Sequence, residues 1–416
     1  MAIMAYNYSS KSLFINIALA LIAFAYVYRT ISVRMIVFGV GTTHKNVNAS
    51  GCSVFGKEIP EIQGCESIQV DPRTGLAYMA CGNRGARMRW LDTKSKYNPI
   101  YEQFNDHVVV MDTKNNLKIL KVLELTEGGI GGKMTLVPFQ QDFRVHGFDI
   151  YWDNVDPEVL TFMFVNHQRS GNAISIFKHK IGSEYIQHIK TVRSHLLYSP
   201  NDVVATSRST FYATNELAYT RGLMRKIEIL LGMPWGYVVH YSHTGMFTKA
   251  TDGIAYPNGI TKSADGGTIY VAASSEPSVS MFKPKLDGTL ELLSKQVFRD
   301  FVPDNISVDA KTGHILVAGF LNTLEMFRYN HEVLHGTSAQ PAAGIRRLVP
   351  PKSPHRSFVE ENILVHDGRL LPSTTAATIQ RHGTAKRILL GSAMADHIAI
   401  CNVNERMEHR ARTSLI

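Results

Sequence analysis

The stretch Pro303-Asp304-Asn305-Ile306-Ser307-Val308-Asp309-Ala310-Lys311-Thr312-Gly313 joins a polar pair to a β-hairpin. Asp304-Asn305 is an adjacent carboxylate and amide, the hard oxygen ligands that calcium takes. We expect a strand at Ile306–Val308, a turn at Asp309–Gly313 and a second strand at His314–Ala318. The pattern therefore places a polar pair at the mouth of a hairpin.

The same outline recurs along the chain, with strands rich in Val, Ile, Tyr and Phe and turns rich in Asp, Gly and Ser. Further copies begin at Ile68–Val70, Phe148–Tyr151, Val203–Ala205, Gly259–Thr261 and, more weakly, Asn362–Val365. Second hairpins lie between these units, such as Val108–Met111 with Leu117–Val122. Four strands per unit and a period of about 40–80 residues indicate an all-β fold, a six-bladed β-propeller. A large β-sandwich or two all-β domains would also contain such hairpins, but the regular alternation of inner and outer hairpins favours the propeller.

The composition is that of a globular protein, with 44% hydrophobic and 19% charged residues in a chain of 416. The net charge is +9, but the Lys and Arg residues are scattered and form no long run of like charge. No nucleic-acid motif is present. We therefore expect a mildly basic surface and no nucleic-acid partner.

An apolar segment at Leu13–Tyr28 precedes the repeats and is short for a membrane span of about 20 residues. Ala23-Phe24-Ala25 matches a small-residue cleavage site, so a removed signal peptide and a retained signal anchor both fit. The flanking basic residues favour a cytoplasmic C-terminal side, whereas the cysteines favour a lumenal one. We adopt the lumenal interpretation, in the secretory pathway, with the protein membrane-anchored or extracellular. The expected domains are an anchor and linker (1–35), a propeller (36–403) and a polar basic tail (404–416).

Four cysteines, Cys52, Cys65, Cys81 and Cys401, form no CxxC pair, so zinc and redox motifs are not supported. A Cys52–Cys401 bridge would close a very long loop, where the entropic gain is largest in principle. Asn48-Ala49-Ser50 is a glycosylation sequon near the start of the folded part.

One interruption of the β pattern is helical, at Ala218–Leu231, inside the third unit. Its apolar residues Leu223, Ile227, Leu230 and Leu231 follow helical spacing. We expect an insertion on one face of the propeller, either a lid, a membrane-contacting element or a helix packed over the propeller.

Polar residues precede the first strands of five units in the same phase. Because the first strand of each blade lines the channel of a propeller, these residues should meet at one end of it. They supply the hard oxygen donors Glu66, Asn201, Asn258, Asp304 and Asn305. Calcium fits this set and zinc does not.

Two histidines fall at the same end of the expected channel. His146 opens the second unit, and His167 follows the second strand of that hairpin. Paired imidazoles can act as a general base and its support, or as a structural pair under a loop. The adjacent calcium ligands favour the catalytic interpretation.

From about Cys52 to Cys401 the chain resembles the paraoxonase/arylesterase family of six-bladed propeller lactonases with two calcium ions. The matching stretches are Val145-His-Gly-Phe148, Phe164-Val-Asn-His167, Pro200-Asn-Asp-Val203, Pro257-Asn-Gly-Ile260, Asp304-Asn-Ile-Ser-Val-Asp309 and the segment Leu231–Ser242.

The resemblance implies that the five oxygen donors hold a catalytic calcium and that His146 and His167 activate water. It implies a second, structural calcium at Asp202 and the carbonyl of Phe148. It further implies a Cys52–Cys401 disulfide and a retained N-terminal anchor.

Three departures from the family stand out. Ser67 replaces the family's acidic residue after the glutamate, which should weaken the structural calcium site. Phe320 falls where the family often has a histidine, and the loop Gly82–Trp90 differs from the family's active-site loop.

We predict a calcium-dependent hydrolase of lactones and aryl esters. The alternatives are a strictosidine-synthase-like or gluconolactonase-like propeller enzyme, and a membrane-tethered binding propeller that uses calcium for stability alone.

Overall fold

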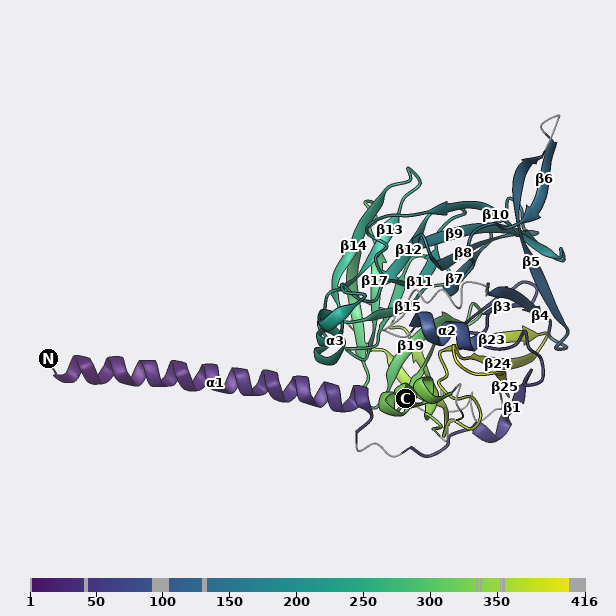
Figure 1. Cartoon of the computed structure of the whole chain (residues 1–416). Helices are drawn as coiled ribbons and strands as arrows, with labels where there is room; N and C mark the ends of the chain where they lie inside the picture. Colours follow the sequence, from purple (N-terminus) through teal and green to yellow (C-terminus); the bar gives the residue numbers. More distant parts are fainter. Residues whose placement is uncertain are drawn as a thin grey trace.

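The computed structural model describes residues 2–40, 44–91, 105–128, 133–333, 336, 339–351, 353 and 356–403. Its body is a six-bladed β-propeller, and one long helix, α1 (Ala2–Phe38), projects from it (Figure 1). The propeller predicted from the repeated hairpins is confirmed. The expected basic tail lies outside the described residues.

Each blade consists of four hydrogen-bonded antiparallel strands, and the first strands of the six blades contact one another in a closed ring. Blades 1 to 3 contain β2 (Ser67–Val70), β3 (Ala77–Cys81), β4 (His107–Met111) and β5 (Leu117–Gly128); β7 (Val145–Tyr151), β8 (Val159–Gln168), β9 (Gly171–Lys180) and β10 (Tyr185–Val192); and β11 (Pro200–Ala205), β12 (Phe211–Asn215), β13 (Gly236–Tyr241) and β14 (Phe247–Ile254). Blades 4 to 6 contain β15 (Pro257–Lys262), β16 (Ile269–Ala273), β17 (Ser278–Pro284) and β18 (Leu290–Val297); β19 (Val302–Val308), β20 (Ile315–Phe320), β21 (Ala343–Val349) and β22 (Val359–His366); and β23 (Ala376–His382), β24 (Ala385–Gly391), β25 (Ile398–Asn402) and β1 (Cys52–Phe55).

The two ends of the propeller close the ring together, because β1 pairs with β25 as the outer strand of blade 6. Cys52 lies opposite Cys401 in this pair, and the two are joined by a disulfide. The bridge spans a sequence separation of 349 residues, so it removes a large loop entropy from the unfolded chain. The pairing implied by the family resemblance is present.

Blades 1 and 2 share one sheet, which the sequence pattern did not indicate. The outer strands β5 and β10 pair in parallel, and β6 (Lys133–Pro138) extends β5 into a hairpin that projects beyond the body (Figure 1). Both blades meet over an aromatic core that includes Phe143, Phe148 and Phe164. Burial of these large aromatic rings stabilises the junction between the two blades.

The expected start of the sixth unit at Asn362–Val365 is wrong. This segment belongs to β22, the outer strand of blade 5, and blade 6 begins with β23. An Asp367-Gly368 turn follows β22 and resembles the turns after first strands. Hairpin signals are the same for inner and outer strands, so they did not separate the two.

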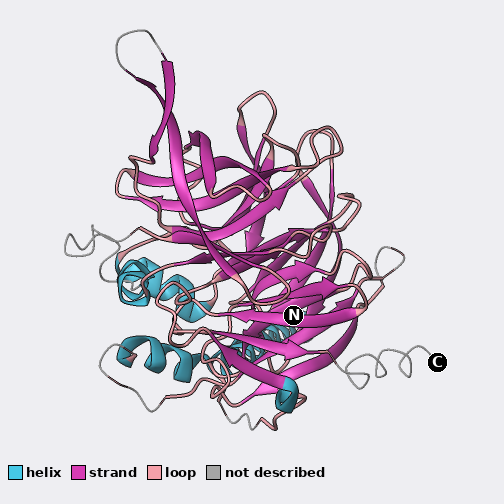
Figure 2. Cartoon of the chain, turned by 90° about the vertical axis from the view of Figure 1, so that its right-hand side faces the viewer, coloured by secondary structure: helices cyan, strands magenta, loops and turns pink. Residues whose placement is uncertain are grey.

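Helices gather on one side of the sheets (Figure 2). They are α2 (Arg84–Leu91), α3 (Gly222–Leu231) and α4 (Thr323–Glu332), and a 3₁₀ turn, η1 (Ala49–Gly51), precedes β1. The helix expected at Ala218–Leu231 begins four residues later. The carboxylate of Glu228 accepts the backbone N–H groups of Ala218 and Tyr219, which holds this segment outside the helix.

The apolar stripe of α3 faces outward, although the apolar spacing suggested that this stripe would face the protein. Leu223, Leu230 and Leu231 are each about half exposed or more, whereas Arg225 and Glu228 are buried. The polar side of the helix is therefore the side that contacts the propeller.

His366, the last residue of β22, is a buried histidine held neutral by its contacts. Its Nδ1 accepts the N–H of Gly368 and its Nε2 lies 3.1 Å from the hydroxyl of Thr374, which donates to Leu371 O. Protonation of Nδ1 would therefore set two donors against each other. Burial lowers the pKa of His366 to about 4.

Acidification should destabilise the protein through His366. A folded-state pKa below the unfolded value of about 6.5 means that the unfolded chain binds more protons, so stability is lost as pH falls from 6.5 toward 4. Between pH 7.5 and 5 the loss should be about 2 kcal/mol from this residue. H366N should show a correspondingly smaller pH dependence of the free energy of unfolding in urea. The exposed His382 gives the control H382N, which should behave as wild type; equal pH dependence of all three proteins would contradict the assignment.

Candidate functional site

β-Bulges in four neighbouring first strands build one end of the channel. The register shifts between Val145 and Phe148 in β7, Pro200 and Val203 in β11, Pro257 and Ile260 in β15, and Pro303 and Ile306 in β19. The two residues looped out at these bulges are, in turn, His146-Gly147, Asn201-Asp202, Asn258-Gly259 and Asp304-Asn305. Bulges next to active sites commonly re-aim side chains. The polar pairs thus lie inside the strands, and not ahead of them as the sequence suggested.

Two of the bulges need glycine because the neighbouring bulge packs directly against them. A Cβ on Gly147 would lie 2.0 Å from Oδ1 of Asp202, and a Cβ on Gly259 would lie 2.6 Å from Cα of Asn305. The neighbouring atoms at Gly259 are backbone atoms, so a side chain there could not be accommodated by a small shift of a flexible side chain. The bulges are therefore interlocked from blade to blade.

The five predicted calcium ligands are all buried at this end of the channel. Asn305 Nδ2 donates to the carbonyl of Glu66 (3.3 Å), and the hydroxyl of Ser274 links Asn258 Nδ2 (3.1 Å) to the carbonyl of Pro303 (2.7 Å). Asn201 joins through Glu216, which accepts its amide at 3.0 Å.

Two amide oxygens of this set have no hydrogen-bond partner. Asn258 Oδ1 and Asn305 Oδ1 are both buried and unsatisfied. A buried polar atom without a partner is costly, and such atoms call for a specific explanation. Because each of these residues donates its amide N–H to a protein acceptor, its oxygen is the atom left for a cation. The set therefore fits a hard cation.

Electrostatics of the carboxylates agree with this fit. Burial raises the pKa of Asp304 well above its usual range, and the negative charge of Glu66 raises it further. Burial also acts to raise the pKa of Glu66, but the charge and hydrogen bond of His146 and the charge of Arg87 outweigh it and lower that pKa. Close carboxylates in a buried site are stabilised in their ionised form by a bound cation.

Among the described residues, no group of three or more His, Cys, Asp and Glu side chains is arranged to hold a metal, so amides are essential to this set.

His146 and His167 form a hydrogen-bonded chain with fixed direction. Asn172 Nδ2 donates to Tyr198 O (2.7 Å), so its oxygen faces Nδ1 of His167 (2.6 Å), which must carry the proton. Nε2 of a neutral His167 is then an acceptor for Nδ1–H of His146, at 3.1 Å. The remaining nitrogen, Nε2 of His146, lies 2.9 Å from Oε1 of Glu66. The basic nitrogen of this hydrogen-bonded series is therefore the one that faces Glu66.

Burial lowers the pKa of His146, but the charge of Glu66 and its hydrogen bond outweigh burial and raise the pKa. Without a cation, Glu66 therefore favours the protonated form of His146. Neutralisation of Glu66 by a cation would remove this stabilisation and lower the pKa of His146.

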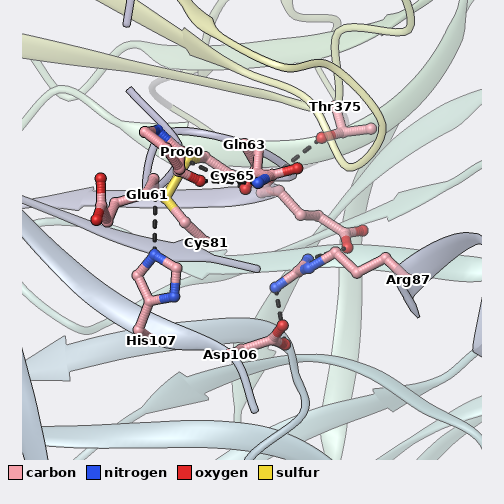
Figure 3. The surroundings of a disulfide bond; sticks show 10 residues. Pro60, Glu61, Gln63, Cys65, Cys81, Arg87, Asp106, His107 and Thr375 are labelled. Carbon is pink, nitrogen blue, oxygen red and sulfur yellow. Dashed lines mark hydrogen bonds and ion pairs between the residues drawn. A yellow bond between two sulfur atoms is a disulfide. The ribbon is translucent and has the colours of Figure 1, made fainter. Parts of the chain in front are cut away.

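Arg87 on α2 is a site residue that the sequence pattern did not identify. Its buried guanidinium contacts Oε2 of Glu66 (3.3 Å) and Oδ2 of Asp106 (3.0 Å), beside the Cys65–Cys81 disulfide (Figure 3). The disulfide joins the residue before Glu66 to the last residue of β3. It thereby fixes Glu66 next to the start of the segment that carries Arg87.

Glu216 was also missed, although a signal for it existed. Glu216 follows Asn215, the strand partner of Pro200, and His167 follows Asn166, the strand partner of Val145. Glu216 and His167 therefore occupy equivalent positions in their hairpins. The phase argument applied to the second strands would have found it. Asn172 and Arg87 had no comparable signal, since Asn172 lies at the start of the third strand of its blade, β9, and Arg87 lies on helix α2.

The residues implied for a second calcium lie deeper in the channel. The carbonyl of Phe148 accepts Nε2 of Gln69 at 2.9 Å. Asp202 accepts the backbone N–H groups of Val203 (2.9 Å) and Ile260 (3.0 Å). Ser67 is buried at the start of β2.

Two further predicted positions have defined surroundings. Phe320 is buried against Val37 of α1 and Val302. Asn48 donates its amide to Ile363 O at 3.0 Å, and its glycosylation stays a prediction.

Comparison with known proteins relates the chain to a defined group. The arylesterase family model matches residues 105–398. Serum paraoxonase/arylesterase 1 of Homo sapiens is 28% identical over 318 residues, which cover 76% of this chain and 81% of that protein. Serum paraoxonase/lactonase 3 of Homo sapiens is 30% identical over 332 residues, which cover 79% and 83%.

A solved gluconolactonase from Xanthomonas campestris aligns with 88% of this chain and 99% of its own, at 12% identity and a TM-score of 0.43, a similarity too low to bear on function. The family model, by contrast, spans well over half of the chain. The chain belongs to the arylesterase family.

Proposed function

We propose that this protein hydrolyses lactones and aryl esters with calcium held by Glu66, Asn201, Asn258, Asp304 and Asn305. The observation that carries the proposal is the pair of orphaned oxygens on Asn258 and Asn305 beside the Glu66–His146 pair. Relatives named as arylesterase and lactonase support the substrate class. Calcium bound there would polarise the ester carbonyl and stabilise negative charge on its oxygen.

His146 acts as the general base in this proposal. Its Nε2 accepts a proton from water, while its Nδ1–H continues to donate a hydrogen bond to Nε2 of His167. The Nδ1–H of His167 likewise continues to donate to Oδ1 of Asn172. Fixing the tautomer in this way keeps the lone pair on the nitrogen that faces the calcium ligands. His167 and Asn172 position the base and do not themselves touch the substrate.

Arg87 holds Glu66 in the orientation that the base needs. It occupies Oε2, so that Oε1 is the oxygen directed at His146. The guanidinium is itself fixed by Asp106, which also accepts the N–H of Val145 at 2.7 Å, the residue before His146. Both partners of the Glu66–His146 contact are thus tied to one buried ion-pair network.

We further propose that α1 is retained and anchors the protein to a membrane in the secretory pathway. Ser12–Phe38 is long and apolar enough to cross a membrane, with a mean hydropathy of 1.7. Its last turns belong to the body: Val37 packs against Val302 and Phe320, and Arg34 donates to the carbonyls of Ile229 and Ser275. The outward apolar side chains of α3 lie beside this end of α1, as a surface facing the same lipid would. The disulfides agree with an oxidising compartment.

Calcium removal should abolish hydrolysis. The full-length protein in detergent should cleave an aryl ester and a δ-lactone, lose the activity in chelator and regain it when calcium is restored. D304N should lower kcat/KM by roughly a hundredfold or more. The exposed Asp265 gives the control D265N, which should resemble wild type.

Hydrolysis that persists after thorough calcium removal would contradict the mechanism. A protein that binds calcium but cleaves no ester or lactone would favour the non-catalytic binding propeller.

Loss of Asn172 should weaken the base without affecting the metal. N172L removes the acceptor that fixes the tautomer of His167, so kcat should fall roughly ten- to hundredfold with KM little changed, less than the fall in H146Q. N172D, which retains an acceptor oxygen, should recover most of the rate. The calcium content of all three variants should equal that of wild type, and a normal kcat in both N172L and H146Q would dismiss the histidine chain.

A further inference from the structure

The deeper set of channel residues does not fit the second calcium that the family resemblance implies. A divalent cation needs several oxygen ligands, and its affinity depends on how many of them are charged. Here the donors are one carboxylate, Asp202, one hydroxyl, Ser67, and one carbonyl, that of Phe148.

The carbonyl of Phe148 is already occupied. Gln69, two residues after Ser67 on the same face of β2, donates Nε2 to it at 2.9 Å. A cation in contact with this oxygen would face the amide N–H₂ of Gln69, which carries partial positive charge. Of the three positions, Ser67 has thus lost its charge, and the carbonyl of Phe148 has one of its two lone pairs engaged.

Asp202 is engaged as well. Oδ1 accepts the N–H of Val203 and Oδ2 accepts the N–H of Ile260. Oδ1 also packs so closely on Gly147 that a Cβ there would be 2.0 Å away. The carboxylate therefore links blades 2, 3 and 4 through the backbone.

We propose that this protein holds a single calcium ion, at the Asn258–Asn305 end, and that the Gln69–Phe148 hydrogen bond stands in place of the second ion, for which Ser67 supplies no carboxylate. This inference rests on the proposed function for the identity of the first ion. The contrast between the two sets of residues supports this inference. Asn258 Oδ1 and Asn305 Oδ1 have no hydrogen-bond partner among the described residues, whereas the Phe148 carbonyl and both carboxylate oxygens of Asp202 accept hydrogen bonds.

Calcium content tests the inference without reference to activity. The full-length protein in detergent is dialysed to equilibrium against buffered calcium, and bound calcium per chain is measured by elemental analysis. We expect one ion in wild type and none in D304N. S67D/Q69A restores a carboxylate and frees the Phe148 carbonyl, so it should hold two.

The outcomes separate the two claims. Two ions in wild type would overturn the inference, and so would one ion that survives in D304N and is lost in D202N. A folded S67D/Q69A that still binds one ion would contradict the role given to Ser67 and Gln69. No bound calcium in wild type would instead refute the proposed function. Since D202N also removes two structural hydrogen bonds, its circular dichroism spectrum is compared with wild type, and the S67D/Q69A count does not depend on it.

Discussion

Interlocked β-bulges are the constraint on which the rest of the structure depends. Each of four first strands loops out two residues at the same end of the channel, and two of those pairs need a glycine so that the next bulge can approach. A regular strand would direct alternate side chains to opposite faces. The bulges instead bring His146, Asn201, Asn258 and Asp304 to one point, and the ring closed by β1 and the Cys52–Cys401 bridge keeps the blades from separating.

The buried charges at this end of the channel carry a free-energy cost in the absence of a cation, and they suit the site to bind one. Glu66 and Asp304 are buried within each other's field, and the positive charge that acts on them in the described part of the chain comes from Arg87 and from His146, whose pKa Glu66 raises. Two amide oxygens are left without donors. Such an arrangement is stable when a cation supplies the missing positive charge, and the same cation would convert His146 from an acid into a base.

Much of the fold was predictable because its signals are local and repeated. Strand, turn and strand recur with polar residues in constant phase. This pattern predicted the propeller, and it also predicted that the five oxygen donors and both histidines lie at one end of the channel. The sixth blade was misplaced because Asn362–Val365 has the same hairpin pattern in an outer strand. Arg87 and the orientation of α3 could not be predicted, since each depends on which other segment packs against it, and the sequence pattern alone did not assign the Cys65–Cys81 pairing. Glu216 could have been, from its phase after β12.

A crystal structure of the protein with calcium would show where the ion binds. We expect an ion whose ligands include Oδ1 of Asn258 and Oδ1 of Asn305, at about 2.3–2.6 Å, together with the carboxylates of Glu66 and Asp304. An ion bound elsewhere in the channel, with both amide oxygens still without a partner, would contradict it.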